Sequence, residues 1–207
     1  YGNGCPVKPR GVDNSSASLA DSIGSGSALF NGTSDKIDCG LIAELQSQSN
    51  QTITAWIKAT NTGGTEPIFS CIKDDNEGLE FGLNGNRLRA IVENGADFVG
   101  TAGTNTYSYS TGTGIGWSHV AMVFDGSGSG DADKLKIYRD GVEESLTYSG
   151  TAPTETDNIL ALKTAFIGHE GVGTEQFFNG NIAQVGLWNR SLSQEEIQEE
   201  GQKQYSE

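Results

Sequence analysis

Apolar and polar residues alternate along most of this chain, in short bursts that each end in turn-forming residues. Successive side chains of an extended strand point to opposite sides, so each burst predicts a strand with one buried face. The turn signals recur about every ten residues, a spacing that is typical of β-sandwiches and barrels. The sequence therefore predicts an all-β fold, with bursts that include QTITAWIKA (51–59), GLEFGLNG (78–85), WSHVAMVFDG (117–126) and NGNIAQVGLWN (179–189).

One hairpin can be predicted in detail. Asp140 and Gly141 stand between two alternating bursts, and such a pair supplies the positive φ angles that a two-residue hairpin turn needs. The loop before this hairpin, DGSGSGDAD (125–133), is acidic and glycine-rich, and we expect it to be long and flexible. On the strand that precedes the loop, alternation places Val120, Met122 and Phe124 on one face and His119, Ala121 and Val123 on the other.

A single segment near the C-terminus has a convincing helix signal. Ser193 is the expected N-cap, and Glu196 follows three residues later, which makes a capping box. Leu192 and Ile197 are the main apolar residues, and the pattern fades near Gly201. We expect a short helix that lies on the sandwich by this narrow apolar stripe.

The charge balance excludes two classes of partner. The chain holds 27 acidic and 13 basic residues, a formal net charge of −14. No basic patch is present to neutralise phosphates, so nucleic acid is not an expected partner. No apolar run reaches the roughly 18 residues of a membrane span, so membrane insertion is not expected either. Residues 1–27 are rich in Gly, Ser and Asn and predict an N-terminal arm or an irregular edge segment.

The chain has three cysteines, Cys5, Cys39 and Cys71, and none of them forms a Cys-x-x-Cys pair. A zinc site is therefore not expected. Cys39 and Cys71 each lie in an alternating stretch. This position fits two interpretations, small core residues or a disulfide in a secreted protein, and the sequence leaves both open.

Five segments, taken in chain order, resemble a known family. GSALFNGTSDKIDCG, TITAWIK, WSHVAMVFDG, LKIYRDGV and FFNGNIAQVGLWNRSLSQEEI are similar to successive strands and the final helix of laminin-G-like (concanavalin A-like) jelly-roll domains. The resemblance runs from Ala28 to Gly201. It implies a two-sheet antiparallel jelly-roll sandwich with a short C-terminal helix over residues 28–207, after an arm at 1–27.

The resemblance also interprets a repeated tripeptide, Phe-Asn-Gly at 30–32 and at 178–180. In a jelly roll the first and last strands lie side by side, which helps to cover an edge. We expect each tripeptide to start one of these two strands and to place its Phe in the core. The three tryptophans lie in alternating stretches and are expected in the core rather than in a sugar-binding platform: Trp56, Trp117 and Trp188.

Catalysis is not expected. Glycoside hydrolases of this fold need two carboxylates that flank the scissile bond. The one Glu-x-Asp stretch is Glu155-Thr156-Asp157, which lacks a second glutamate and lies in a turn-rich segment. His119 lies within a strand pattern, which favours a packing or hydrogen-bonding role.

Calcium is a candidate cofactor, because carboxylate and carbonyl oxygens gather in loops. Asp125, Asp131 and Asp133 form one cluster, and solvated turn residues are the alternative interpretation. Relatives often hold calcium through an Asp on the last strand, where this chain has Ala183. Asn31, Asp35 and Gln184 are the residues that would have to compensate, and the first two are kept as candidate ligands.

Two further clusters are candidate ligand-binding residues. Tyr107 and Tyr109 lie on the same side of an alternating stretch among hydroxyl and amide groups, which suits sugar stacking; packing of a sheet face is the alternative. Asp74, Asp75 and Asn76 form a polar turn.

The predicted function is that of a non-catalytic adhesion or carbohydrate-binding module outside a cell. Its partner would be a glycan. The main alternative is a structural subunit of a virion or an extracellular filament, which would bind other subunits of a surface assembly. A glycoside hydrolase is the third interpretation.

Overall fold

Strand β3 (Asn50–Ala59) has two distinct faces, as the predicted alternation requires. Ile53, Ala55 and Ile57 are buried in the core, whereas Trp56 between them points to the other face and is half-buried. The structure is a computed structural model that describes residues 26–60, 63–74, 77–95, 98–102, 116–171 and 176–203.

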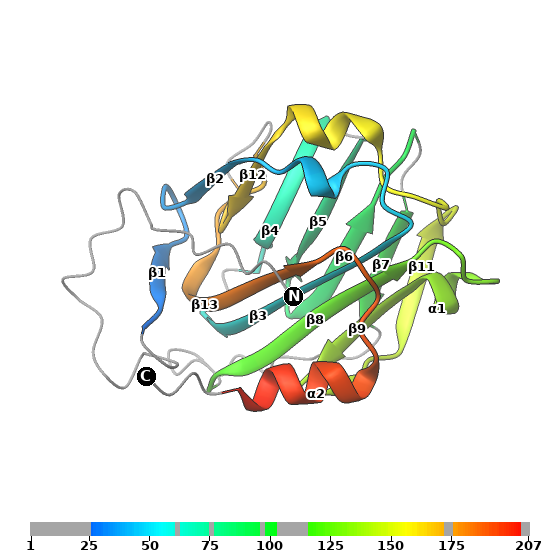
Figure 1. The fold of residues 1–207 in the computed structure, drawn as a ribbon. Helices are drawn as coiled ribbons and strands as arrows, with labels where there is room; N and C mark the ends of the chain where they lie inside the picture. Colours follow the sequence, from blue (N-terminus) through cyan, green and yellow to red (C-terminus); the bar gives the residue numbers. More distant parts are fainter. Residues whose placement is uncertain are drawn as a thin grey trace.

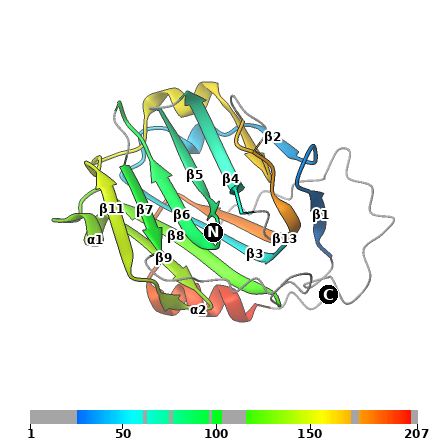
Figure 2. The ribbon, with the colours of Figure 1, turned by 180° about the vertical axis from the view of Figure 1, so that it is seen from behind.

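Two stacked antiparallel sheets form the molecule (Figures 1 and 2). Sheet A has the order β1 (Ala28–Asn31), β13 (Asn179–Trp188), β3, β8 (Ser118–Asp125), β9 (Leu135–Arg139) and β10 (Val142–Glu143). Sheet B has the order β11 (Leu146–Gly150), β7 (Phe98–Ala102), β6 (Arg87–Val92), β5 (Glu77–Asn84), β4 (Thr65–Asp74), β12 (Thr164–Ile167) and β2 (Ile37–Leu41). Helical turns η3 (Ala43–Leu45), η4 (Asn158–Leu162) and α1 (Asp131–Lys134) lie in the connections, and α2 (Gln194–Gln202) follows the last strand. The predicted jelly-roll sandwich with a C-terminal helix is confirmed.

The core lies between the two sheets. Aliphatic residues from both sheets surround six fully buried phenylalanines, which are Phe30, Phe69, Phe81, Phe98, Phe124 and Phe178. Large aromatic rings at these positions bury much apolar surface, which is the main source of stability in such a fold.

The two Phe-Asn-Gly tripeptides meet where the first and last strands pair. Phe30 lies opposite Gly180 across β1 and β13, and the rings of Phe30 and Phe178 pack edge to face with centroids 6.2 Å apart. A Cβ on Gly180 would lie 2.2 Å from the Lys58 carbonyl oxygen, so only glycine fits there. The pairing of the strands and the burial of both rings are confirmed. One detail was wrong: the first tripeptide ends β1 rather than starting it, because the Asn31 side chain closes a turn there.

The hairpin between β9 and β10 has the predicted turn. Asp140 and Gly141 have φ angles of 50° and 76°, and Arg139 pairs with Val142. The division of β8 into two faces is also confirmed, since Met122 and its neighbours on that face join the core between the sheets, while Ala121 and Val123 pack under α2.

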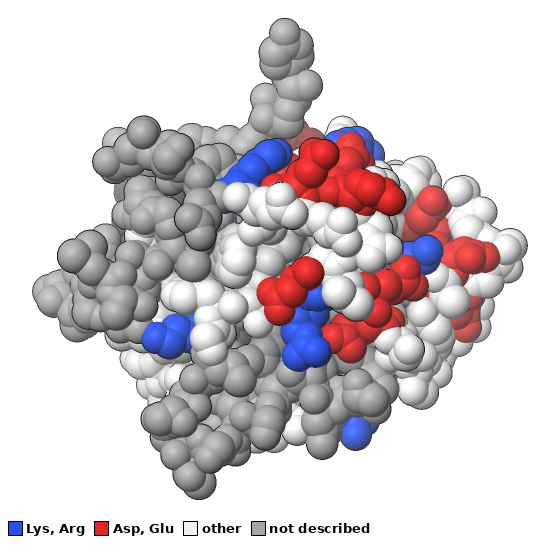
Figure 3. Space-filling view, turned by 90° about the horizontal axis from the view of Figure 1, so that it is seen from below, with Lys and Arg blue, Asp and Glu red and all other residues white. Residues whose placement is uncertain are grey.

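Helix α2 covers part of the outer face of sheet A (Figure 1). Its residue Ile197 is fully buried against Ala121, Val123 and Tyr138, together with Leu192 from the loop before it. Figure 3, which looks at the molecule from below, shows acidic side chains gathered on this face with single basic side chains between them. Much of the acidic excess is therefore a solvated surface.

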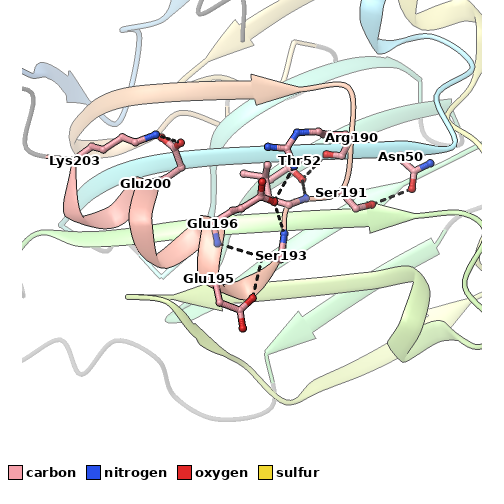
Figure 4. A network of polar contacts seen from close by, with 10 residues as sticks. Asn50, Thr52, Arg190, Ser191, Ser193, Glu195, Glu196, Glu200 and Lys203 are labelled. Atoms are coloured by element: carbon pink, nitrogen blue, oxygen red, sulfur yellow. Dashed lines mark hydrogen bonds and ion pairs between the residues drawn. The ribbon is translucent and has the colours of Figure 1, made fainter. Parts of the chain in front are cut away.

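The start of α2 is fastened by polar contacts (Figure 4). Ser193 Oγ accepts from the Glu196 N–H at 3.3 Å, and Glu196 Oε2 accepts from the Ser193 N–H at 2.9 Å, which confirms the capping box. Arg190 also donates to Glu196, and this contact, followed by the Ser193 N–H, lowers the pKa of Glu196 to about 2. Thr52 on β3 joins the preceding loop by accepting from the Leu192 N–H at 3.0 Å.

Cys71 is a core residue, as one of the two interpretations predicted. Its thiol donates to the Leu160 carbonyl at 3.5 Å, and burial raises its pKa to about 11. Cys39 is half-buried and packs against the edge of the core. Cys5 and the predicted arm up to residue 25 lie outside the described residues. None of the helices in the described ranges is long and apolar enough to cross a membrane.

Candidate functional site

The candidate site lies on the outer face of sheet B, the face that is turned away from the core (Figure 2). The antiparallel register sets one residue of each strand side by side across this face. Most of these residues have core residues before and after them on their own strand, and the others pair with one that does. Because successive side chains point to opposite faces, all of these residues point outward. From β12 to β11 this cross-strand row reads Phe166, Ser70, Glu80, Ile91, Val99 and Ser149.

An ion pair occupies the centre of the cross-strand row. The Arg89 guanidinium on β6 donates through Nη2 to Glu80 Oε1 on β5. Arg89 stands directly opposite Gly82, where a side chain would clash with the backbone of Glu66 and Pro67. The Glu80 side chain is 0% exposed and the Arg89 side chain 16% exposed, so Arg89 is the member that solvent can reach.

Part of the hydrogen-bonding capacity of this pair is unused. Glu80 Oε2 and Arg89 Nε are buried, and neither has a hydrogen-bond partner among the residues that the structure describes. A buried polar atom in this condition costs about 1–3 kcal/mol, and more when the group is charged. The pair therefore contains one acceptor and one donor that the described residues leave unsatisfied.

A second carboxylate lies on the same face. Gly78 is the outward position that precedes Glu80 on β5, and Glu93 Oε2 lies 3.3 Å from the place that a Cβ of Gly78 would take. Glu93 is 6% exposed. Alternate residues of a strand are about 7 Å apart. Glu80 and Glu93 therefore place two buried carboxylates at neighbouring positions of the sheet face.

An aromatic group forms the β12 end of the row. The Phe166 and His169 rings meet edge to face with centroids 5.3 Å apart, and the Phe177 ring lies 4.5 Å from His169. Lys36 Nζ lies 5.2 Å from the centre of the Phe166 ring, within cation–π range. Ser70 Oγ is 2.6 Å from the His169 carbonyl oxygen and ties this group to β4.

The His169 ring is a neutral donor. The Gly171 N–H donates to its Nδ1 at 2.9 Å, so the proton of the neutral ring is on Nε2. Burial, followed by the charge of Lys36, lowers the pKa of His169 below its usual 6.5. At pH 7 the ring therefore offers an N–H group beside the aromatic end of the row.

Most of the ligand-binding residues predicted from the sequence cannot be placed in this site. Tyr107, Tyr109, Asp75 and Asn76 lie outside the described residues. Asp74 ends β4, and its side chain is likewise not described. These assignments stay predictions.

The candidate calcium ligands Asn31 and Asp35 do come together. The Asn31 N–H donates to Asp35 Oδ2 at 3.1 Å, and the Asp35 N–H donates to Asn31 Oδ1 at 3.2 Å. Asn31 Oδ1 also accepts from the N–H groups of Thr33 and Ser34, so it closes a turn after β1. These oxygens serve the backbone of the turn, and calcium binding there stays a prediction.

The other candidate ligands are engaged within their own loop. Asp125 Oδ1 accepts from Ser127, and Asp133 Oδ2 accepts from Ser129 Oγ at 2.6 Å, a contact that lowers the pKa of Asp133. Asp131 opens the single helical turn α1, so the loop is more regular than the predicted flexible one. In the described part of the chain, no three or more His, Cys, Asp or Glu side chains are grouped to hold a metal ion.

The prediction that the tryptophans lie in the core was wrong. Trp56, Trp117 and Trp188 are half-buried, and none belongs to the cluster between the sheets. Trp56 occupies an outward position of sheet A, because Ile53, Ala55 and Ile57 take the inward positions of β3, and Trp188 on β13 lies opposite Thr52. Trp188 packs against the cluster under α2 instead.

The only Glu-x-Asp stretch is not on a sheet face. Glu155 is exposed, Asp157 is buried, and both lie in the connection that leads to η4. The Thr156 hydroxyl between them donates to the Leu45 carbonyl at 2.6 Å, which gives this stretch a structural role.

The sequence contains a signal for the central ion pair that lies outside the motifs predicted above. In GLEFGLN (78–84), Leu79, Phe81 and Leu83 alternate with Gly78, Glu80 and Gly82. A lone acid between two glycines on one face of a strand is unusual, because glycine is disfavoured within strands unless another group needs the space. Here those groups are Ile72 and the Glu93 carboxylate beside Gly78, and the backbone of Glu66 and Pro67 beside Gly82.

Two stacked antiparallel sheets with this strand order define a jelly-roll β-sandwich protein. The chain belongs to the concanavalin A-like lectin/glucanases superfamily, whose laminin G-like family model matches residues 31–198. A search among curated proteins found no match.

Three solved structures illustrate the fold similarity. Domain 4 of AbnA, a GH43 extracellular arabinanase from Geobacillus stearothermophilus in complex with arabinotriose, is 21% identical with a TM-score of 0.60, over 92% of this chain and 84% of that one. The ligand binding domain of botulinum neurotoxin serotype D, in complex with N-acetylneuraminic acid, is 18% identical with a TM-score of 0.60, over 88% and 45%. NanB sialidase from Streptococcus pneumoniae is 16% identical with a TM-score of 0.60, over 84% and 27%. The chain thus spans less than half of the last two proteins, and at these identities the likeness concerns the fold alone.

Proposed function

We propose that this chain is a non-catalytic carbohydrate-binding module whose ligand lies on the outer face of sheet B. The observation that carries the proposal is the half-satisfied pair of Glu80 and Arg89 at the centre of that face. Family membership supports it, as does the fold shared with domains whose structures hold arabinotriose and N-acetylneuraminic acid. We further propose that the module works outside a cell, where it meets surface glycans.

The chemistry of the face suits a sugar. Arg89 is the member of the ion pair that solvent reaches, and its guanidinium can donate to a sugar hydroxyl. Ile91 and Val99, both half-buried, offer apolar contact to sugar C–H groups beyond the ion pair. At the other end of the row, Phe166 and Phe177 offer ring faces and edges.

A screen of the full chain against a glycan array, with and without calcium, tests the proposal. A glycan that binds is then titrated by calorimetry into the wild type, Glu80→Gln and Val99→Arg. Val99→Arg keeps the ion pair but places a long side chain on the face. Both variants should lose at least tenfold in affinity, and Glu155→Gln, an exposed acid off the face, should not. Failure to bind any glycan at high protein concentration would refute the proposal.

A glycoside hydrolase is the second candidate, and the spacing of Glu80 and Glu93 favours it. Carboxyl groups about 5–9.5 Å apart serve such enzymes. We rank binding first because Arg89 already holds one oxygen of Glu80, which a base or nucleophile would need. Release of reducing ends from a bound glycan, abolished by both Glu80→Gln and Glu93→Gln, would assign hydrolysis instead.

The structural-subunit alternative predicts self-association through residues 1–27. Sedimentation of the chain with and without that segment separates the two functions. A glycan-binding module should sediment as the same species in both cases.

A further inference from the structure

We propose that the last turn of α2, residues 198–203, is a proton-sensitive cover on the outer face of sheet A. When His119 on β8 takes up a proton, this turn detaches from the sheet and exposes the imidazole beside Trp56, while the start of the helix stays bound. The inference concerns sheet A and does not rest on the proposed function.

The helix backbone packs directly on the imidazole. A Cβ on Gly201 would lie 3.0 Å from His119 Nδ1 and 3.2 Å from His119 Cγ, so a large side chain at this position would displace the helix or the ring. The Trp56 ring on β3 lies beside the imidazole, with centroids 5.5 Å apart. His119 is almost fully buried as a result, and the last turn of α2 forms part of its cover.

This environment suits a neutral imidazole and not a charged one. A charged ring carries a proton on both nitrogens, and each nitrogen then needs an acceptor. His119 Nδ1 is buried and has no hydrogen-bond partner within the described ranges. Charging the ring in place would therefore leave an unsatisfied donor beneath the helix, which is costly. Detachment of the last turn lets water reach Nδ1 and removes this cost.

The charged groups around the imidazole do not supply the missing acceptor. Asp140 in the β9–β10 turn accepts from the backbone N–H of His119 at 2.9 Å. Glu200 on α2 is paired with Lys203 (Figure 4). The charged residue that β3 turns to this face is Lys58. Burial lowers the pKa of His119 below its usual 6.5, and the two carboxylates oppose this only in part.

The end of α2 is held more weakly than its start. Ile197 is fully buried, and the capping box fixes the first turn. Residues 198–202 contain no apolar side chain, and they include Gly201, a poor helix former, and two glutamates near the negative end of the helix dipole. This turn is attached through Gln198 Nε2, which donates to the β9–β10 turn at 3.0 Å, and through its packing on His119. Loss of that packing should release the last turn before the rest of the helix.

The direction of the pH effect follows from proton binding. The imidazole has its ordinary pKa once the turn has detached, and a lower pKa while it is covered. The detached form therefore binds the proton more tightly, and its population should rise as the pH falls below about 6.5, by up to about tenfold per pH unit. Most carboxylates stay charged above about pH 5, and His169 is the one other histidine of the chain.

Hydrogen exchange of the full chain, measured residue by residue by NMR at pH 7.5 and 5.5 and corrected for the intrinsic rate at each pH, tests the proposal. Protection of the amides of residues 201–203 should fall at least fivefold at pH 5.5. Their exchange should not depend on low concentrations of urea, which indicates a local opening. The amides of β8 should stay at least tenfold better protected.

Variants assign the effect to the imidazole. His119→Phe and His119→Gln cannot take up a proton, so the fall should be absent in both, while His169→Phe should keep it. Gly201→Val places a side chain against the imidazole and should give low protection of this turn at pH 7.5 already. Valine is a better helix former than glycine, so that loss could not come from helix propensity. If His119→Phe does not fold, as judged by its thermal melt, the His119→Gln result decides.

Three results would overturn the proposal. The first is equal protection of residues 201–203 at the two pH values. The second is exchange of these amides with the rate and urea dependence of the β8 amides, because acid would then act through global unfolding alone. The third is a fall in protection that persists in the His119 variants, which would assign the effect to another group.

Discussion

The imidazole of His119 lies against the indole of Trp56, with ring centroids 5.5 Å apart, on the outer face of sheet A. The last turn of α2 passes directly over the imidazole: a Cβ on Gly201 would lie 3.0 Å from His119 Nδ1. His119 is 3% exposed, and its Nδ1 has no hydrogen-bond partner within the described ranges. The ring is thus packed as a neutral group between a sheet and a helix.

Acid should weaken the fold through His119. Burial lowers the pKa of His119 below its ordinary 6.5, and the carboxylates of Asp140 and Glu200 oppose this only in part. The unfolded chain therefore binds the proton more readily, and stability falls as the pH drops below about 6.5. Urea unfolding should give a lower free energy of unfolding at pH 5.5 than at pH 7.5, and this decrease should be smaller in His119→Phe. His169→Phe, which removes the other histidine, should keep most of the decrease. An equal loss in His119→Phe and wild type would contradict this account.

Removing the buried side chain of Ile197 should destabilise the protein. Ile197→Ala leaves a cavity between α2 and β8 and should cost about 2 kcal/mol or more. Urea unfolding measures the difference, and Glu199→Ala, at an exposed position of the same helix, is the control. Unfolding of Ile197→Ala at the wild-type midpoint would mean that α2 contributes nothing to the fold.

The N-cap of α2 should stabilise the protein independently of the burial of Ile197. Ser193→Ala removes the oxygen that accepts from the Glu196 N–H and should cost about 1 kcal/mol. Ser193→Asn keeps an acceptor there and should recover most of that loss. Equal midpoints for Ser193→Ala and wild type would show that Arg190 and Thr52 hold the start of the helix without the cap.

Removing Arg89 alone should lower the free energy of unfolding more than removing both charges of the ion pair on sheet B. Arg89→Met leaves Glu80 as an uncompensated buried charge and should cost about 3–5 kcal/mol. The double variant Glu80→Gln/Arg89→Met should be more stable than Arg89→Met, because no charge remains. A complete double-mutant cycle in urea measures the coupling. Additive single effects would mean that the two side chains do not interact.

Local sequence signals were sufficient to predict individual strands, turns and the terminal helix. The alternation of β8 identified its two faces, and the Asp140–Gly141 pair identified a turn whose positive φ angles need those residues. Ser193 and Glu196 marked the start of α2 to the residue. Each of these features depends on contacts within a few residues, so the sequence pattern carries it directly.

The candidate site could not be predicted in the same way. Alternation showed that Glu80 and Phe81 face opposite sides of a strand, but not that Ser70 would stand beside Glu80 and Phe166 beside Ser70. That placement depends on the order and register of strands that are distant in the chain. The acids singled out from the sequence, such as Asp125 and Asp133, gathered in one loop and proved to be bonded within it.

The sequence by itself determined the all-β class, because a period of two with frequent turns permits little except a sandwich or a barrel of strands. It also determined the family and the boundaries of the terminal helix. Only the tertiary structure decided which face of each strand is covered. Trp56 points outward because Ile53 and Ile57 face the second sheet, and Glu80 meets Arg89 on an outer face because β5 and β6 pair in a register that sets Arg89 opposite Gly82. Burial is a property of the neighbours that a side chain acquires on folding, and pairing between distant strands supplies those neighbours.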